Sequence, residues 1–273
     1  MGFPGSILLN QNDVYHPTSD KRHPLGTRGY TRDSRSYRYS KAGGTALTVG
    51  KLMQMPAHIV NWDKQLHPST YGHGTTISTN STYIYVHFRA VSSGTLPTSA
   101  NVVADGLMIV NDGTGQGQSL QIASQSASTS TLAAAACRTK IVFREGEHLT
   151  EALVASTGVG GGSTGSQVGL IKNKYDDIVV SAKNATGTGI AVGVTPCAVT
   201  ADYYFWLQTW GPAVCLLDTT GTIGYAVVRS ATDAGAVAQN ATKNVGITQP
   251  SIGALIQTGV DTEYVMLDLM LAP

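Results

Sequence analysis

After Lys41, apolar runs rich in β-branched and aromatic residues, separated by polar turn residues, predict β-strands almost throughout. Residues 263–271 are one such strand, and its alternation places Val265, Leu267, Leu269 and Leu271 on one face. The other face would carry Tyr264, Met266, Asp268 and Met270. Both faces are therefore largely apolar, and a sheet with one face in water would leave much apolar surface uncovered.

Runs rich in β-branched and aromatic residues predict further strands, separated by segments rich in Gly, Asn, Asp and Thr. The expected strands are a pair in 45–54 with a turn at Gly50, followed by 82–91, 106–110, 120–123, 140–143, 177–182, 190–194, 203–210, 213–217, 223–228 and 263–271. Helical spacing of apolar residues favours one helix at 147–156, and 133–136 fits either a helix or a strand. Short strands at this spacing predict an all-β fold, with a sandwich-like or barrel-like body.

The glycine-rich stretch 158–169 is the sharpest change in composition, and it fits a loop or a linker between two lobes. We therefore expect an extended N-terminal arm at 1–45, a β lobe at 46–160 and a C-terminal β lobe at 165–273. Whether the body forms one domain or two is left open by the sequence.

Charge is scarce in this chain of 273 residues, since only 13% are charged and the formal net charge is +1. A near-neutral chain argues against a dedicated nucleic-acid binder, which usually has a clear basic excess. No apolar run is long enough for a helix that spans a membrane. Three cysteines without a C-x-x-C pair indicate small buried residues in a reducing compartment, and a signal peptide is not expected.

The first 41 residues are the exception, with seven basic and three acidic residues. This segment is also rich in tyrosine, and 35–41 alternates as an extended strand would. Tyr and Arg are enriched among the residues that anchor interfaces, so we expect the arm to grip an acidic partner. The predicted contact residues are Arg28, Tyr30, Arg32, Arg35, Tyr37, Arg38, Tyr39 and Lys41. A solvated or self-wrapping N-terminus is the alternative.

Segment 203–210 is rich in aromatic residues, and segment 263–271 is apolar on both faces. Both features favour burial against another copy of the chain, although burial in the core of one copy also fits. The low charge of the chain favours an obligate oligomer. The expected interface residues are Tyr203, Phe205, Trp206, Trp210, Tyr264, Met266 and Met270.

The catalytic and cofactor motifs in the sequence are incomplete or lack the structural context that they require. We therefore expect no enzyme activity, no cofactor and no metal. Gly160, Gly162 and Gly165 have dinucleotide-loop spacing, but no strand leads into them and no long helical run follows. A metal site from Asp63, His67 and His73 is not favoured, because His67 precedes a proline and no regular helix keeps these groups in register.

Residues 25–52, with the run Tyr37-Arg-Tyr-Ser-Lys-Ala-Gly-Gly and Gly50-Lys-Leu, resemble structural proteins of tailed-bacteriophage virions. So do Tyr204-Phe-Trp-Leu-Gln-Thr-Trp-Gly-Pro-Ala and the C-terminal end. The resemblance is greatest to capsid decoration (cement) proteins, and it implies a β-rich homotrimer. Its place would be the outer capsid surface of the virion, bound to the major capsid protein and assembled in the host cytoplasm. No catalytic residues carry over from that class.

Two other functions fit the same sequence. One is a structural component of the tail, baseplate or head fibre, which differs from a cement protein in its copy number per particle. The other is a carbohydrate-binding β protein, in which exposed Trp62, Trp206 or Trp210 would stack on sugar rings. The paired carboxylates of a glycosidase are not evident.

Overall fold

The structure is a computed structural model that describes residues 5–57, 62, 66–88, 97, 99–128, 138–156, 165–183, 188–240 and 250–273. Nearly all regular structure in it is β, so the predicted all-β class is confirmed. Within the described ranges, no helix combines the length and the apolar character that a membrane span requires.

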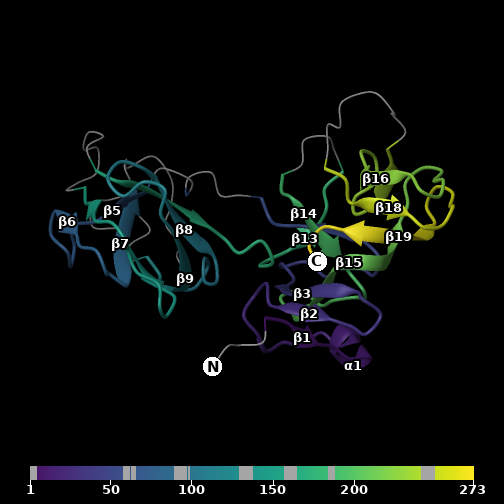
Figure 1. The fold of residues 1–273 in the computed structure, drawn as a ribbon, viewed down its shortest axis with the longest axis horizontal. Coiled ribbons are helices and arrows are strands. Elements are labelled where there is room, and N and C mark those ends of the chain that lie inside the picture. The colour runs from purple at the N-terminus through teal and green to yellow at the C-terminus, as the bar shows by residue number, and fades with distance from the viewer. Residues whose placement is uncertain are drawn as a thin grey trace. The chain divides into compact units, whose positions relative to one another are not determined.

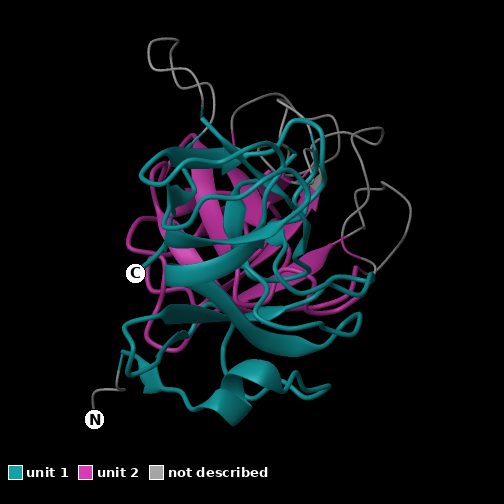
Figure 2. Ribbon diagram, turned by 90° about the vertical axis from the view of Figure 1, so that its right-hand side faces the viewer, with its two compact units in different colours: residues 1–57, 174–273 teal, residues 58–173 magenta. Residues whose placement is uncertain are grey.

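The chain forms two compact units, which Figure 2 colours separately. Unit 1 combines Met1–Ala57 with Lys174–Pro273, and unit 2 is His58–Asn173. These units differ from the expected lobes 46–160 and 165–273, because unit 2 is inserted between two neighbouring strands of unit 1. The glycine-rich stretch 158–169, where we expected the boundary, falls inside unit 2 and lies largely outside the described residues.

Unit 1 is built on an eleven-stranded sheet whose main path runs β1-β2-β3-β15-β19-β18-β16-β17, with β4, β13 and β14 attached beside β15 (Figure 1). Its elements are β1 (Ile7–Leu8), α1 (Gln11–Tyr15), β2 (Arg28–Tyr30), β3 (Ser36–Lys41), β4 (Leu52–Gln54), β13 (Val179–Val180), β14 (Ala191–Val194), β15 (Tyr204–Leu216), β16 (Ala226–Arg229), β17 (Val237–Gln239), β18 (Gly253–Leu255) and β19 (Tyr264–Met270).

Unit 2 is a closed barrel of six strands in the order β10-β7-β5-β12-β8-β9, with a separate two-stranded sheet of β6 and β11. Its strands are β5 (Leu66–Pro68), β6 (Thr76–Ile77), β7 (Tyr83–Phe88), β8 (Leu107–Asp112), β9 (Ser119–Gln125), β10 (Thr139–Phe143), β11 (Leu153–Val154) and β12 (Gln167–Ile171). Side chains such as Ile84, Met108 and Ile141 fill the barrel with a core of its own. Closure leaves no open edge along these six strands.

The expected strands 203–210 and 213–217 are one strand, β15, of 13 residues. Its first part pairs antiparallel with β3, from Tyr204 opposite Lys41 to Trp210 opposite Ser36. Its second part pairs with β19, from Trp210 opposite Met270 to Leu216 opposite Tyr264. The segments near the two ends of the chain therefore lie on either side of β15 (Figure 1).

The N-terminal segment is part of unit 1, which corrects the expectation of an extended arm at 1–45. β2 and β3 extend the sheet, and Tyr37, Tyr39 and Trp206 pack with Leu9 and Val14 in a core cluster. The short helix α1 was not expected. It begins with a capping box, in which the Asn10 side chain accepts from the Asp13 amide and the Asp13 carboxylate accepts from the Asn10 amide.

The expected helix at 147–156 is not formed. Leu149 and Leu153 are instead buried in the core of the barrel unit, and Leu153 pairs with Ile77 in the β6–β11 sheet. Two leucines four residues apart fit a helix face, but here an extended segment buries both of them. The ambiguous segment 133–136 lies outside the described residues.

We predict that unit 1 folds without unit 2. Gln54 pairs with Val179 and Met53 with Val180, so the chain leaves and re-enters unit 1 close to one antiparallel ladder. A short Gly-Ser linker in place of 58–173 should preserve the far-UV circular dichroism of a β protein and one cooperative urea transition.

Removal of residues 1–41 is the contrasting control for this prediction. It strips β3 from β15 and exposes Trp206, so unit 1 should lose its cooperative transition. A linker variant that fails to fold while the 1–41 deletion folds normally would contradict this account of unit 1.

Candidate interaction surface

The outward face of the β15–β19 pair carries a continuous apolar surface, which we call the apolar ribbon. Strand alternation and the pairing register place four cross-strand pairs on this face. They are Trp210–Met270, Pro212–Asp268, Val214–Met266 and Leu216–Tyr264. Only one of these eight side chains, Asp268, is charged, and the opposite face of both strands is buried in the core of unit 1.

The ribbon is open to solvent within one chain. The exposed fractions are 48% for Val214, 49% for Tyr264, 39% for Met266 and 47% for Met270. Single exposed apolar residues are common, but neighbouring ones on a regular sheet mark an interaction surface. The predicted division of residues 263–271 into two largely apolar faces is confirmed, with Val265, Leu267 and Leu269 inward.

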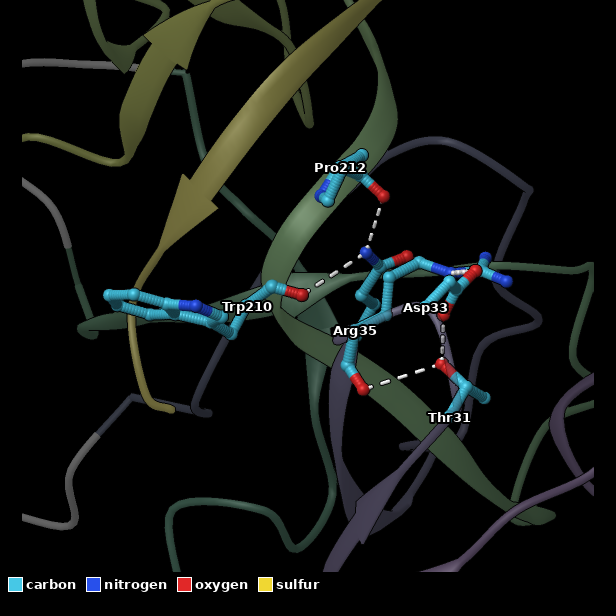
Figure 3. Close-up of polar contacts among 6 residues, drawn as sticks. Thr31, Asp33, Arg35, Trp210 and Pro212 are labelled. Carbon is cyan, nitrogen blue, oxygen red and sulfur yellow. Dashed lines mark hydrogen bonds and ion pairs between the residues drawn. The ribbon is translucent and has the colours of Figure 1, made fainter.

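A bulge in β15 shapes one end of the ribbon. The register shifts between Gln208 and Trp210, and Gly211 has a positive φ of 81° that a side chain would strain. The Gln208 side-chain amide donates to the Trp210 carbonyl at 3.3 Å and to the Pro212 carbonyl at 2.7 Å (Figure 3). These bonds fix the bend at which β15 leaves β3 and joins β19.

A cavity of about 460 Å³ adjoins the ribbon and shares Pro212, Val214 and Met266 with it. Val194 and Pro196 extend its apolar lining. Its polar side carries Tyr15, Asp33 and Arg35, which also line a second cavity of about 610 Å³ beside α1. A protruding apolar side chain of a partner fits the first cavity, with hydrogen-bonding groups at its rim.

The polar rim is held by an ion pair in the turn between β2 and β3. The Arg35 Nε donates to Asp33 Oδ2 at 2.8 Å, and the Thr31 hydroxyl donates to the other oxygen of that carboxylate (Figure 3). The hydrogen bond from Thr31, together with the positive charge of Arg35, lowers the pKa of Asp33. Asp33 therefore stays ionised and keeps Arg35 in place near neutral pH.

The eight predicted arm residues divide into inward and outward groups. Tyr37 and Tyr39 are buried in their own unit, and burial raises the pKa of Tyr37 to about 12. Lys41 lies 3.1 Å from Asp177 and 3.5 Å from Asp202. Burial contradicts the expected contact role of Tyr37 and Tyr39. Lys41, and Arg35 with its ion pair to Asp33, are partly exposed, and their contact with a partner stays a prediction.

The other four arm residues, Arg28, Tyr30, Arg32 and Arg38, form what we call the basic strip. Arg28 stands directly opposite Arg38 in the β2–β3 ladder, and two like charges so placed destabilise a sheet. Arg38 donates to the backbone oxygens of Gly26 and Pro273. Tyr30 and Arg32 are exposed. Part of the positive charge predicted for the arm therefore lies at the surface of unit 1.

The seven residues expected at an oligomer interface also divide. Trp210, Tyr264, Met266 and Met270 lie on the apolar ribbon. Phe205 and Trp206 are buried within their own unit, and Tyr203 packs against the cluster that contains Phe205. For these last three, burial within one chain replaces the expected burial between chains.

Three carboxylates gather where the sequence analysis expected nothing. Oxygens of Asp218, Asp233 and Asp261 lie within 4.8 Å of one another, and they form the one group of this kind among the described residues. Asp218 accepts from the hydroxyls of Ser230 and Thr232, so its structural role is to brace that turn. His67 and His73 are not part of the group, and Asp63 lies outside the described residues.

The barrel holds a buried histidine pair that the sequence analysis also missed. His67 and His87 face each other across β5 and β7, only 2% and 3% exposed. One ring nitrogen of His67, Nδ1, lies 2.9 Å from the Ser166 carbonyl. Burial, with smaller effects from the positive charges of His67 and Arg138, lowers the pKa of His87 to about 4.

No known protein family, curated protein or solved structure matches this chain.

His87 predicts an acid-sensitive barrel. An unfolded histidine takes up a proton near pH 6.5, whereas folded His87 resists protonation until about pH 4. The unfolded state binds more protons between these values, so stability falls as pH drops through that window and levels off below it. We expect a loss of about 2 kcal/mol between pH 7 and 4.5 in urea denaturation.

His87→Gln should remove most of this pH dependence, because glutamine does not titrate. His148→Gln, at an exposed side chain of the same unit, is the matched control. If His87→Gln keeps the full wild-type loss of stability, His87 is not the group responsible.

Proposed function

We propose that this chain is a structural binding protein of a tailed-phage virion, a capsid decoration protein that assembles with itself through the apolar ribbon and attaches to the outside of the shell. The observation that supports it best is the ribbon, because its four cross-strand pairs carry a single charge and Val214, Tyr264, Met266 and Met270 on it are 39–49% exposed. The resemblance of residues 25–52 and of the β15 segment to virion proteins supports the virion setting.

A second copy of the chain is the occupant that the ribbon fits best. Interfaces between identical subunits are more apolar than transient interfaces and have few charges at their centre. With one carboxylate among eight side chains, the ribbon offers little to a charged partner and much to another apolar surface. A homotrimer is the assembly that the resemblance implies.

The basic strip is the surface of unit 1 that would bind the shell. Arg28 and Arg38 are half-buried, and their like charges repel each other across the ladder. A carboxylate from the major capsid protein would pair with the planar guanidinium groups and relieve that repulsion. Three strips in one trimer would raise the effective affinity without strong individual contacts.

A tail, baseplate or head-fibre component would use the same two surfaces, and its copy number in the particle distinguishes it from a decoration protein. The sugar-binding alternative needs exposed tryptophans to stack on sugar rings. Two of the three candidates do not meet this need, because Trp62 and Trp206 are only 5% and 4% exposed. Trp210 remains half-buried on the ribbon.

We predict that Met266→Asp dissociates the oligomer. It places a carboxylate in the middle of the ribbon next to Asp268, so association should weaken by about a hundredfold or more. Light scattering coupled to size-exclusion chromatography should report a change from the trimer mass to the 28.5 kDa of one chain.

Ile223→Asp is the matched control, because Ile223 is 59% exposed and belongs to neither strand of the ribbon. It should leave the mass unchanged. A wild-type protein that is monomeric at micromolar concentration, or equal effects of the two variants, would refute assembly through the ribbon.

Charge reversal of the basic strip should separate shell binding from assembly. Arg28→Glu with Arg38→Glu removes the cations that face the shell, so co-sedimentation with undecorated phage shells should be lost while the oligomer mass stays the same. Arg144→Glu, at an exposed arginine of unit 2, controls for the change in net charge. Undiminished decoration by the double variant would exclude the strip as the contact.

A further inference from the structure

The outer face of the barrel carries an aromatic and basic surface that the proposed function does not use. Ile84 and Val86 point into the barrel core, so the alternation of β7 turns Tyr83 and Tyr85 outward. Lys140 of β10 is paired with Tyr85 across the ladder. We call the whole set the tyrosine–cation surface, and its members are Tyr71, His73, Tyr83, Tyr85, Arg138 and Lys140.

A tight turn after β5 completes this surface. The Gly74 amide donates to the Thr70 carbonyl at 2.9 Å, and Gly72 and Gly74 have positive φ values of 77° and 74°. The turn lays Tyr71 against the edge of Tyr85, with ring centroids 4.9 Å apart, and brings His73 within 4.7 Å of Tyr83. Tyr83 and Tyr85 also meet edge to face at 6.0 Å. The rings thus form one connected array.

Two cations lie on the rings of this array. The guanidinium carbon of Arg138 is 3.9 Å from the centroid of the Tyr71 ring, and Lys140 Nζ is 4.3 Å from that of Tyr83. Arg138 and Lys140 are two residues apart along an extended segment, so their backbones are roughly 7 Å apart on one face. The ring contacts hold both cations in fixed positions beside the aromatic array.

The charges of unit 2 balance overall. The unit contains six basic and six acidic residues. The six members of the surface include two cations and no carboxylate; the acidic residues of unit 2 that the structure describes are Asp105, Asp112, Glu145, Glu147 and Glu151. The surface is therefore a local concentration of positive charge and aromatic rings on a neutral domain, which favours a small number of anionic groups on a ligand that also has flat apolar faces.

We propose that the tyrosine–cation surface binds an acidic polysaccharide. The C–H face of a pyranose ring packs on a tyrosine ring, and Tyr71 is 50% exposed for this purpose. Arg138 and Lys140 would pair with carboxylate or sulfate groups of the sugar chain. Single-stranded nucleic acid fits less well, because a neutral unit with two cations at the surface neutralises few phosphates.

The test uses the full-length protein and oligogalacturonate, a carboxylated sugar chain, in isothermal titration calorimetry. Binding should be at least about tenfold weaker to neutral galactan, which lacks the carboxylates. Tyr71→Ala and Lys140→Ala should each weaken binding by about tenfold, whereas Tyr71→Phe, which keeps the ring, should bind as the wild type does.

Arg144→Ala removes one positive charge elsewhere on the same unit and should leave binding unchanged. Thermal unfolding of each variant shows whether it is folded, and Tyr71→Phe against Tyr71→Ala isolates the ring. Dextran sulfate, which carries sulfates and no carboxylates, distinguishes sulfate from carboxylate recognition, and binding of either sugar chain supports the proposal.

Three results would overturn the proposal. They are absence of binding to both sugar chains, equal loss of binding in Arg144→Ala, and binding of polyglutamate or a (dT)20 oligonucleotide as tight as that of the sugars. The last would show a general polyanion or nucleic-acid surface. None of these results bears on the apolar ribbon, so the two proposals fail separately.

Discussion

The backbone ladder along β15 is the interaction on which the rest of unit 1 depends. One strand of 13 residues pairs with β3 through its first part and with β19 through its second, and it also contacts β14. The bulge between Gln208 and Trp210, followed by the positive φ of Gly211, allows the change of partner, and the Gln208 side chain holds this bend. Segments distant in the sequence meet there, so the N-terminal residues are as much part of the sheet as the C-terminal ones.

The same ladder decides which side chains are available to partners. Because β15 and β19 pair in register, the inward residues of both strands share one core and the outward residues form the apolar ribbon. On β3, Tyr37 and Tyr39 turn inward, while Arg38 and the opposite Arg28 of β2 lie on the other face. Unit 1 thus presents an apolar surface and a basic one. The inserted barrel, with its own core, carries a third surface that neither of these requires.

Local patterns predicted much of the fold but not its connections. Runs of β-branched and aromatic residues predicted β7, β10, β15 and β19, and strand alternation assigned the two faces of β19 correctly. It could not show that β3 pairs with β15, because a ladder between distant segments leaves no local signal. Tyr37 and Tyr39 were predicted at an interface but are buried in unit 1. Their residue type could not decide between the two places, because aromatic residues suit a core and a contact surface equally well. Strands of two residues, such as β6 and β11, are held by tertiary pairing alone.

Oxidation of methionine by hydrogen peroxide tests the central claim most directly, because it reports the exposure of individual side chains in the intact protein. Met53 and Met108 are fully buried within one chain, whereas Met266 and Met270 are exposed by 39% and 47%. If a second copy covers the ribbon, Met266 and Met270 in the purified protein oxidise as slowly as Met53 and Met108, and dilution to monomer accelerates only the first two. Rapid oxidation of Met266 and Met270 at every protein concentration would contradict the account.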